Sequence, residues 1–413
     1  MAGPEALGGI SRAMSNVNFR RYWYGMSVIT VCFWAYRTAL GWLTWQLTED
    51  PKWLGFVVFT EMVPMILLGP IAGAVVDKYG SLRVGRLAQM AWALSIALIA
   101  VATLGGIMTP VLLLVFSFAQ GCVAGFSNPA HLALVAKVVP RDHISPAVAL
   151  QSGSVQTGRF IGPAITGPLL VAYSPGVVFA LITVGFVYFV VILYLVRTIE
   201  PEERQESSQG ILADFKDGLS YAADNLHIRT FILFSAVMGI CLRSVPELMP
   251  AFAVDIFGRG ESGLAWLLAA FGLGAVFSSL WLAVRGRATG LARVFAVNLC
   301  IGALALIAFG LTANFWIALA LVVVAGFGAN TVSVAGQIIV QSVVAGHMRA
   351  RVMGLMGTTF RAFPALGALF LGLGASAFGL TAPIITAAML ALVAWAYFLW
   401  LNRDGALRRR RDG

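Results

Sequence analysis

Twelve long apolar segments run along this chain, and they decide what it can fold into. Each is about 20 residues or longer, the length that a helix needs to cross the hydrocarbon core of a bilayer. Only 11% of the 413 residues are charged, against about a quarter in soluble proteins. We therefore predict an all-α membrane protein with twelve transmembrane helices. The spans are predicted near residues 22–47, 53–76, 84–107, 110–136, 147–173, 177–197, 230–256, 263–284, 292–312, 315–342, 352–378 and 381–401.

The longest polar stretch lies near the middle of the chain and separates six spans from six. It predicts an N-terminal six-helix half over residues 1–197, a cytoplasmic linker over 198–229 and a C-terminal six-helix half with a basic tail over 230–413. Within the linker, ILADFKDGLSYAADNL has the apolar spacing of an amphipathic helix. We expect this helix to lie at the cytoplasmic membrane surface.

A weak internal repeat relates the two halves. Sliding the chain by 205 residues aligns spans four and five with spans ten and eleven, so that Gly121 matches Gly326 and Gly162 matches Gly367. Two six-span halves related in this way are a known transporter organisation, in which the substrate binds between the halves. The repeat is therefore typical of a transporter, and a chance alignment is the alternative.

The basic residues lie mainly on one side of the predicted membrane. They are Arg20, Arg21, Lys78, Arg83, Arg86, Lys137, Arg141, Arg285, Arg287, Arg293, Arg349, Arg351 and Arg408 to Arg411. The loops on the other side hold only Lys52 and Arg259. By the positive-inside rule both termini of this multi-pass protein are cytoplasmic. The location that we expect for it is the bacterial inner membrane. The net charge of +10 thus reflects topology and contact with anionic lipid rather than nucleic-acid binding.

The loop between spans two and three carries the first specific motif. In GAVVDKYGSLRVGR, the residues Gly73, Asp77, Lys78, Gly80 and Arg83 resemble the G-x3-D-[RK]-x-G-x2-[RK] signature of the major facilitator superfamily. The glycines permit a tight turn and close helix approach. Asp77 can pair with basic groups or with the positive end of a helix, which would make the loop a conformational latch. An ordinary turn with charges that set topology is the alternative.

The fifth span carries a second motif of that superfamily. Gly153, Gly162, Pro163 and Gly167 resemble the G-x8-G-P-x2-G-G pattern of its exporters, with Thr166 in place of one glycine. The resemblance implies antiport. Small residues would permit close packing, and the proline a bend, in a span that repacks as access alternates. A glycine-rich packed helix without that role is the alternative.

The fourth span and the loop after it indicate which subgroup of the superfamily the chain resembles. AQGCVAG keeps Gln120, Gly121 and Ala124 of the superfamily's R-x2-Q-G-x-G-A pattern, but Ser117 replaces its arginine and Val123 its second glycine. The following NPA…VP…AVAL…R..GPA run is similar to the subgroup of enterobactin exporters and related drug-efflux proteins. This resemblance implies two six-helix halves, alternating access and export of a siderophore-like molecule.

Carboxylates inside spans are the candidates for proton coupling, because ionisable groups are costly in a membrane. Glu61 is the first candidate, and a structural partnership with Arg37 is the alternative. Glu247 and Asp255 in span seven are the others. On a continuous helix Arg243 and Glu247 would share one face and could neutralise each other.

The predicted substrate cavity uses polar and basic side chains of the spans. Its candidates are Arg37, Gln120, Gln156, Arg159, Arg243, Gln337 and Arg361. Arg159 and Arg361 lie on spans related by the repeat and could together neutralise an anionic or catecholate-like substrate. Hydrogen bonding of these arginines to the carbonyls of neighbouring helices is the alternative.

These observations predict a secondary active transporter that exports a small organic molecule, siderophore-like or otherwise anionic, by proton antiport. Broad drug efflux, import of a metabolite, and a non-transporting scaffold or sensor are the alternatives. No nucleophile with a base, paired carboxylates or phosphate-binding loop converges, so we predict no enzyme. We expect no cofactor, and no metal site, since the four cysteines lack ligand spacing. The expected partners are the small-molecule substrate, protons and membrane lipid, with the protein a monomer.

Overall fold

The computed structural model describes residues 14–139, 143–197, 211–286 and 290–403. These residues are almost entirely helical and form no strand. The predicted positions Arg141 and Arg287, the start of the linker and the basic tail lie outside the described residues. Within them, the predicted all-α fold is confirmed.

Twelve predicted spans correspond to eleven long helices and one interrupted segment among the described residues. The long helices are α2 (Val17–Thr48), α3 (Pro51–Tyr79), α4 (Ser81–Leu104), α5 (Pro110–Lys137), α6 (Ile144–Ala172), α7 (Pro175–Leu195), α11 (Gly260–Arg285), α12 (Leu291–Leu311), α13 (Phe315–Val343), α14 (Arg349–Phe378) and α15 (Thr381–Arg403). Ten of the described segments are long and apolar enough to cross a membrane. Helices α2 and α6 are not among these ten, but with 32 and 29 residues they are long enough to span.

The seventh span is broken rather than continuous. Helix α9 (Leu226–Cys241) ends early, and the chain continues through the 3-10 turn η2 (Val245–Leu248), α10 (Met249–Ala251) and the π-helical turn η3 (Phe252–Ile256). Pro246 and Pro250 each remove a backbone donor from the helix ladder, which explains the break. The continuous helix predicted across Arg243 and Glu247 is therefore wrong, and their mutual neutralisation remains a prediction.

The chain divides into two compact units that do not coincide with the predicted halves. Unit 1 comprises residues 1–49, 60–207 and 259–269, and unit 2 comprises the remainder. The first turns of α3 thus belong to unit 2, and the first turns of α11 belong to unit 1. The division at residues 197 and 230 remains a prediction.

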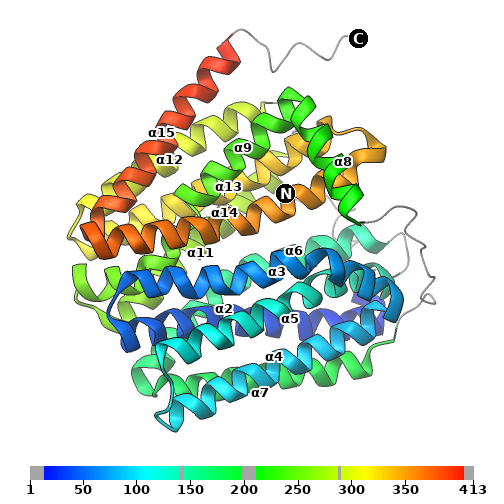
Figure 1. Cartoon of the computed structure of the whole chain (residues 1–413), viewed down its shortest axis with the longest axis vertical. Coiled ribbons are helices and arrows are strands. Elements are labelled where there is room, and N and C mark those ends of the chain that lie inside the picture. The colour runs from blue at the N-terminus through cyan, green and yellow to red at the C-terminus, as the bar shows by residue number, and fades with distance from the viewer. Residues whose placement is uncertain (1–13, 140–142, 198–210, 287–289, 404–413) are drawn as a thin grey trace. The chain divides into compact units, whose positions relative to one another are not determined.

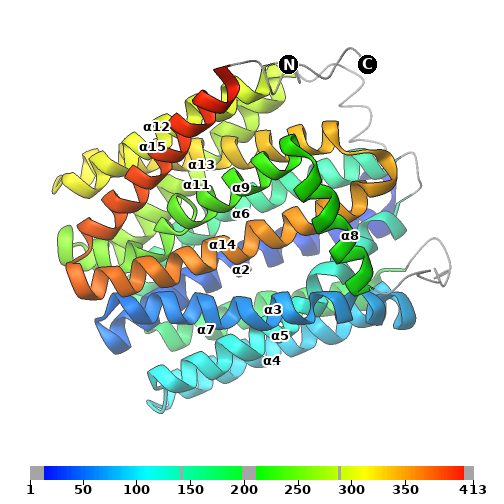
Figure 2. The ribbon, with the colours of Figure 1, turned by 45° about the horizontal axis from the view of Figure 1, so that its top comes forward.

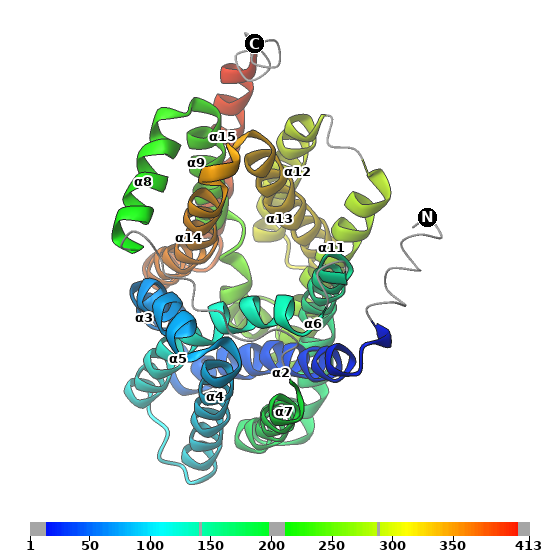
Figure 3. The ribbon, with the colours of Figure 1, turned by 90° about the vertical axis from the view of Figure 1, so that its right-hand side faces the viewer.

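Unit 1 is a bundle around a set of aromatic side chains. Helix α2 packs against α6 and α7, and α4 packs against α5 and α7 (Figures 1 and 3). At the centre, the Trp92 ring stacks on Phe186 at 5.7 Å between centroids and meets Tyr36 edge-on at 5.8 Å. Such pairs stabilise the bundle beyond simple apolar burial.

Unit 2 has a comparable aromatic centre. Helix α12 lies beside α13 and α15, while α9 lies beside α13, α14 and α15 (Figure 2). Phe231, Phe234, Phe295 and Phe398 are buried and in ring contact with one another, with centroid distances from 5.1 to 6.4 Å. This cluster ties α9, α12 and α15 together.

The predicted amphipathic helix is α8 (Ile211–Asp224), and it packs against α14. Arg351 lies 3.5 Å from the Asp217 carboxylate, and the Ala345 amide donates to the Tyr221 hydroxyl at 3.3 Å. The linker helix is therefore fixed to unit 2. Its contact with a membrane surface remains a prediction.

The internal repeat has a physical counterpart in the contacts of its matched glycines. A Cβ on Gly162 of α6 would lie 2.6 Å from the Cβ of Trp34 on α2. A Cβ on Gly367 of α14 would lie 2.5 Å from the carbonyl oxygen of Ile240 on α9. Gly162 thus allows α6 to touch α2, and Gly367 allows α14 to touch α9 in the same way.

The second matched pair behaves in the same way. A Cβ on Gly121 of α5 would overlap the Glu61 carbonyl on α3, and one on Gly326 of α13 would overlap the Phe271 carbonyl on α11. Close helix approach of this kind requires glycine. The repeated glycines therefore set equivalent helix contacts in the two units.

Candidate functional site

A buried ion pair joins α2 to α3 inside unit 1. Arg37 Nη1 lies 2.5 Å from Glu61 Oε2, and the two side chains are 16% and 10% exposed. Glu61 sits beside the close contact of Gly121 with α3, which draws α5 against the same turn. A carboxylate held in this way can exchange its arginine partner for a proton, which is the chemistry that proton coupling needs.

Uncharged polar groups lie near the ion pair. Tyr36 and Gln120 are fully buried, and the Gln120 amide nitrogen donates to Ser95 Oγ at 3.4 Å. Ser117, which stands where the superfamily has an arginine, is buried on α5, and its hydroxyl donates to the Leu113 carbonyl at 2.9 Å. Because Gln120 is buried between α4 and α5, its predicted place in an open substrate cavity is wrong.

Arg159 lies on α6 against the ring of Trp34 on α2. Its guanidinium carbon is 4.8 Å from the ring centroid, a cation–π geometry. Gly158 and Gly162 make this possible, since a Cβ on Gly158 would lie 2.7 Å from Thr30 of α2. No carboxylate pairs with Arg159 in the part of the chain that the structure describes. Gln156, three residues earlier, is half-buried on the same helix.

The predicted cavity residues of unit 2 include two arginines near the break in span seven. Arg243 lies in the break, with its guanidinium carbon 5.4 Å from the ring of Phe360 on α14. Arg361, which follows Phe360, is exposed and pairs with no carboxylate within the described ranges. Gln337 is half-buried on α13. Arg243 thus contacts the residue directly before Arg361.

The other proton-coupling candidates lie in the same broken segment. Glu247 is half-buried in η2, whereas Asp255 is exposed in η3. Asp255 lies within the candidate span Leu226–Ile256 with its side chain exposed, and its role in proton coupling remains a prediction. Glu61 is the most buried of the three candidates.

The latch motif forms the turn between α3 and α4. Gly80 has φ = 88°, a value that side chains disfavour, so this glycine is required by the turn. Asp77 and Arg83 are exposed, and among the described residues neither forms an ion pair. Lys78 is also exposed, with its Nζ 5.2 Å from the Tyr79 ring centroid. The predicted pairing of Asp77 is not formed here.

One more expectation for the latch motif fails. A Cβ on Gly73 would meet no atom within 4 Å, so Gly73 does not mediate a close helix contact. Its motif partner Gly80 is needed for backbone conformation instead. The two glycines of the motif therefore have different local environments.

The exporter-like motif is divided along α6. Gly162 packs against α2 and Gly167 packs against Ala265 of α11 within unit 1, whereas a Cβ on Gly153 would meet no atom within 4 Å. The Thr166 hydroxyl donates to the Gly162 carbonyl at 2.8 Å, and Pro163 is buried within the continuous helix. Close packing is thus found at two of the three motif glycines, and the expectation for Gly153 is wrong.

Two features of unit 2 do not follow from the pattern of apolar residues. The break in span seven lies at Pro246 and Pro250, which are visible in the sequence as VPELMP. Asn330 of α13 donates to Ser278 and Ser279 of α11 at 3.2 and 3.1 Å. The three polar residues in neighbouring spans are the available signal for this helix–helix contact.

Comparison with known proteins gives a consistent picture. The family model described as transmembrane secretion effector matches residues 11–404. The multidrug efflux pump Tap of Mycolicibacterium fortuitum is 26% identical, over 88% of this chain and 91% of its own. The staphyloferrin A transporter of Staphylococcus aureus is 21% identical, over 91% and 94% of the two chains.

Solved structures agree on the fold. The nucleoside transporter NupG superposes with a TM-score of 0.74 at 12% identity, over 93% of this chain and 99% of its own. A bacterial homologue of the lysosomal transporter Spinster, solved inward-facing and unoccupied, gives 0.73 at 14% identity, over 94% and 97%. At these identities the likeness concerns the fold alone.

Proposed function

Because this chain belongs to the transmembrane secretion effector family of the major facilitator superfamily, we propose that it exports an anionic small organic molecule by proton antiport. That it is a transporter rather than an enzyme follows from the family. The outward direction is supported by the relative named as an efflux pump. We place it in the bacterial inner membrane with both termini cytoplasmic, in keeping with the distribution of its basic residues.

The observation that carries the substrate class is Arg159. Its guanidinium lies against Trp34 with no carboxylate partner among the described residues, so its positive charge is not neutralised by the fold. A charge within a membrane span is costly when no counter-charge accompanies it, and an anionic ligand would offset that cost. The indole adds an aromatic face for a planar substrate.

The observation that supports proton coupling is the Arg37–Glu61 pair. A proton on Glu61 would neutralise the carboxylate and free Arg37, so protonation changes the charge of the pair by one unit. Antiport needs a group that is charged in one half of the cycle and neutral in the other. Glu61 supplies such a group in the interior of unit 1.

The test uses inverted membrane vesicles loaded with protons by respiration. We expect accumulation of an anionic, aromatic carboxylate or catecholate, and little accumulation of a permanently cationic dye. Arg159→Gln should abolish that accumulation, while Arg20→Gln, a matched change at an exposed arginine of α2, should not. Uptake of the cationic dye alone, unchanged by Arg159→Gln, would favour broad drug efflux instead.

Two controls test proton coupling and the direction of transport separately: collapse of the proton gradient tests coupling, and the orientation of the vesicles tests direction. Collapse of the proton gradient in wild-type vesicles should stop accumulation. Accumulation that persists after collapse would contradict proton antiport. Accumulation only in right-side-out vesicles would show that the protein is an importer.

A further inference from the structure

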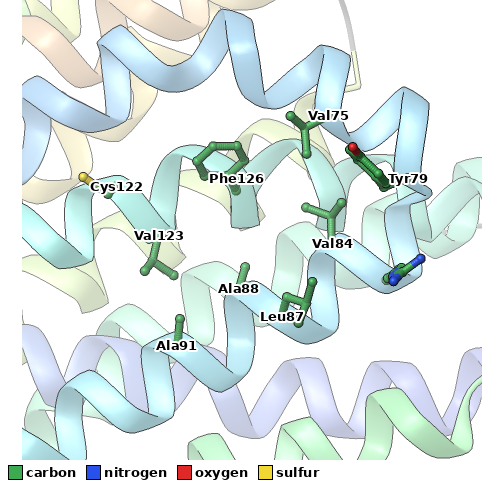
Figure 4. A pocket seen from close by; sticks show the side chains of 10 residues that line it. Val75, Tyr79, Val84, Leu87, Ala88, Ala91, Cys122, Val123 and Phe126 are labelled. Atoms are coloured by element: carbon green, nitrogen blue, oxygen red, sulfur yellow. The ribbon is translucent and has the colours of Figure 1, made fainter.

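Away from the proposed proton and substrate residues, unit 1 contains an apolar groove at the junction of three helices. It has a volume of about 520 Å³ and is lined by the end of α3, the first half of α4 and the middle of α5 (Figure 4). Val75, Leu87, Ala91, Cys122, Val123 and Phe126 line its walls. Its lining therefore shares no residue with the pair Arg37–Glu61 or with Arg159.

A buried apolar cluster forms part of the groove wall. Val76, Val84 and Ala130 form a buried cluster, with Val75, Phe126 and Ala133 packed against it. Ala88 and Ala91 present only methyl groups to the groove from α4, which leaves space between α3 and α5 (Figure 4). The buried cluster forms one wall of the groove, and the small side chains of α4 leave apolar space beside it.

The mouth of the groove is polar and basic. Tyr79 and Arg83 line it at the turn between α3 and α4, and the positive φ of Gly80 creates that turn. Arg83 is exposed and makes no hydrogen bond or ion pair with the described residues. Lys78 lies over the Tyr79 ring and adds a second positive charge nearby.

We propose that this groove binds one acyl chain of an anionic phospholipid, whose phosphate is held at Arg83 and Tyr79. The apolar walls suit a hydrocarbon chain, and the guanidinium and phenol at the mouth suit a phosphate. The turn belongs to the basic side of the chain, which the positive-inside rule places at the cytoplasmic leaflet. Basic pockets between transmembrane helices on that side bind anionic head groups.

The site does not depend on the proposed substrate or on proton coupling. Its ligand joins α3, α4 and α5 at the turn that carries the latch motif. A bound lipid would therefore stabilise this turn. Loss of lipid binding and loss of transport can be measured separately, so the two proposals can fail independently.

The test is native mass spectrometry of the full-length protein in detergent, titrated with phosphatidylglycerol or phosphatidylcholine of the same chains. We expect preferential binding of phosphatidylglycerol to the wild type. Arg83→Gln should weaken it about fivefold, as expected for one basic residue near an anionic group, and Arg83→Lys should restore most of it. Arg20→Gln, at an exposed arginine elsewhere, is the matched control.

A second variant tests the groove itself. Ala91→Phe fills the apolar space and should weaken binding of both lipids equally, whereas Arg83→Gln should weaken phosphatidylglycerol binding more than phosphatidylcholine binding. Size-exclusion profiles and melting temperatures show whether each variant is folded. Glycerol 3-phosphate, which has the head-group phosphate without chains, should not compete.

Three results would overturn the proposal. They are equal binding of the two lipids by the wild type, unchanged phosphatidylglycerol binding by folded Arg83→Gln, and unchanged binding by folded Ala91→Phe. If Ala91→Phe does not fold, Val123→Phe, at another position in the groove lining, replaces it with the same expected loss.

Discussion

Arg37 Nη1 on α2 donates to Glu61 Oε2 on α3 at 2.5 Å, inside unit 1. Both side chains are less than a fifth exposed, so water screens the two charges only weakly. Removing the charge of one member of such a pair leaves the other buried without that counter-charge. Protonation of Glu61 would therefore weaken the contact between α2 and α3 as well as change the local charge.

Glu61→Gln should abolish proton-driven accumulation while leaving substrate binding and downhill exchange. The amide keeps the shape of the carboxylate and can still accept a hydrogen bond from Arg37, but it cannot take up a proton. The measurement compares gradient-driven uptake with counterflow in proteoliposomes. Normal uphill transport with an unchanged pH profile would make Glu61 structural and Glu247 the next candidate.

Removing the arginine of the Arg37–Glu61 pair should mainly lower the stability of the protein. Arg37→Met leaves the Glu61 carboxylate buried without its arginine, and such changes cost about 3–5 kcal/mol. The double variant Arg37→Met with Glu61→Gln removes both charges and should recover much of that loss. Melting temperatures in detergent measure both effects. Equal destabilisation in the single and double variants would show that the charges are not coupled.

The fold is largely predictable from the sequence because membrane spans are long and apolar. The clearest error is in span seven, where the apolar pattern predicts one continuous helix across VPELMP. Proline is tolerated in transmembrane helices, so its presence does not by itself predict a break.

The sequence predicts which residue types form the site better than it predicts where their side chains lie in the fold. Glu61 and Arg37 can be paired from the sequence because each is a lone charge in an apolar span. Gln120 and Gly153 are misplaced, since sequence does not show which face of a helix meets a neighbour. Gly162 packs closely as the exporter-like pattern implies, but the same pattern includes Gly153, so the motif alone does not separate the two glycines.

Asp77→Asn should slow transport without destabilising the protein. Asp77 is exposed and forms no ion pair among the described residues, so its charge contributes little to the stability of this state. If Asp77 makes a latch contact in only part of the transport cycle, its loss should lower the transport rate and leave the melting temperature unchanged. Initial transport rates and melting temperatures test this separation. An unchanged rate in a well-expressed variant would count against a latch at Asp77.

The loop between α2 and α3 should make a small pH-dependent contribution to stability. Burial opposes ionisation of Asp50, but hydrogen bonds from Lys52 and Ser376 outweigh it and hold the pKa of Asp50 below its usual value of 3.8. The Lys52 Nζ lies 2.6 Å from the carboxylate. Because the folded pKa is lowered, this stabilisation is present above pH 3.8 and is lost as the pH falls through the folded pKa.

Asp50→Asn should therefore cost less than about 1 kcal/mol at neutral pH, since the pair is partly exposed. The difference from wild type should disappear in acid, where the wild-type carboxyl is also neutral. Melting temperatures of both proteins between neutral pH and the most acid tolerated condition provide the measurement. A difference that grows in acid would contradict the sign of the pKa shift.

Gly162 and Gly153 offer a matched pair on one helix. A Cβ on Gly162 would lie 2.6 Å from Trp34 Cβ and 2.9 Å from the Ala35 amide nitrogen, whereas one on Gly153 would meet nothing within 4 Å. Gly162→Leu should separate α6 from α2, cost about 1–3 kcal/mol and displace Arg159 from Trp34, so export should fall. Gly153→Leu should fold normally, because leucine favours helix over glycine. Export and melting temperature are measured for both. Equal defects in the two variants would mean that the motif acts through something other than the contact between α6 and α2.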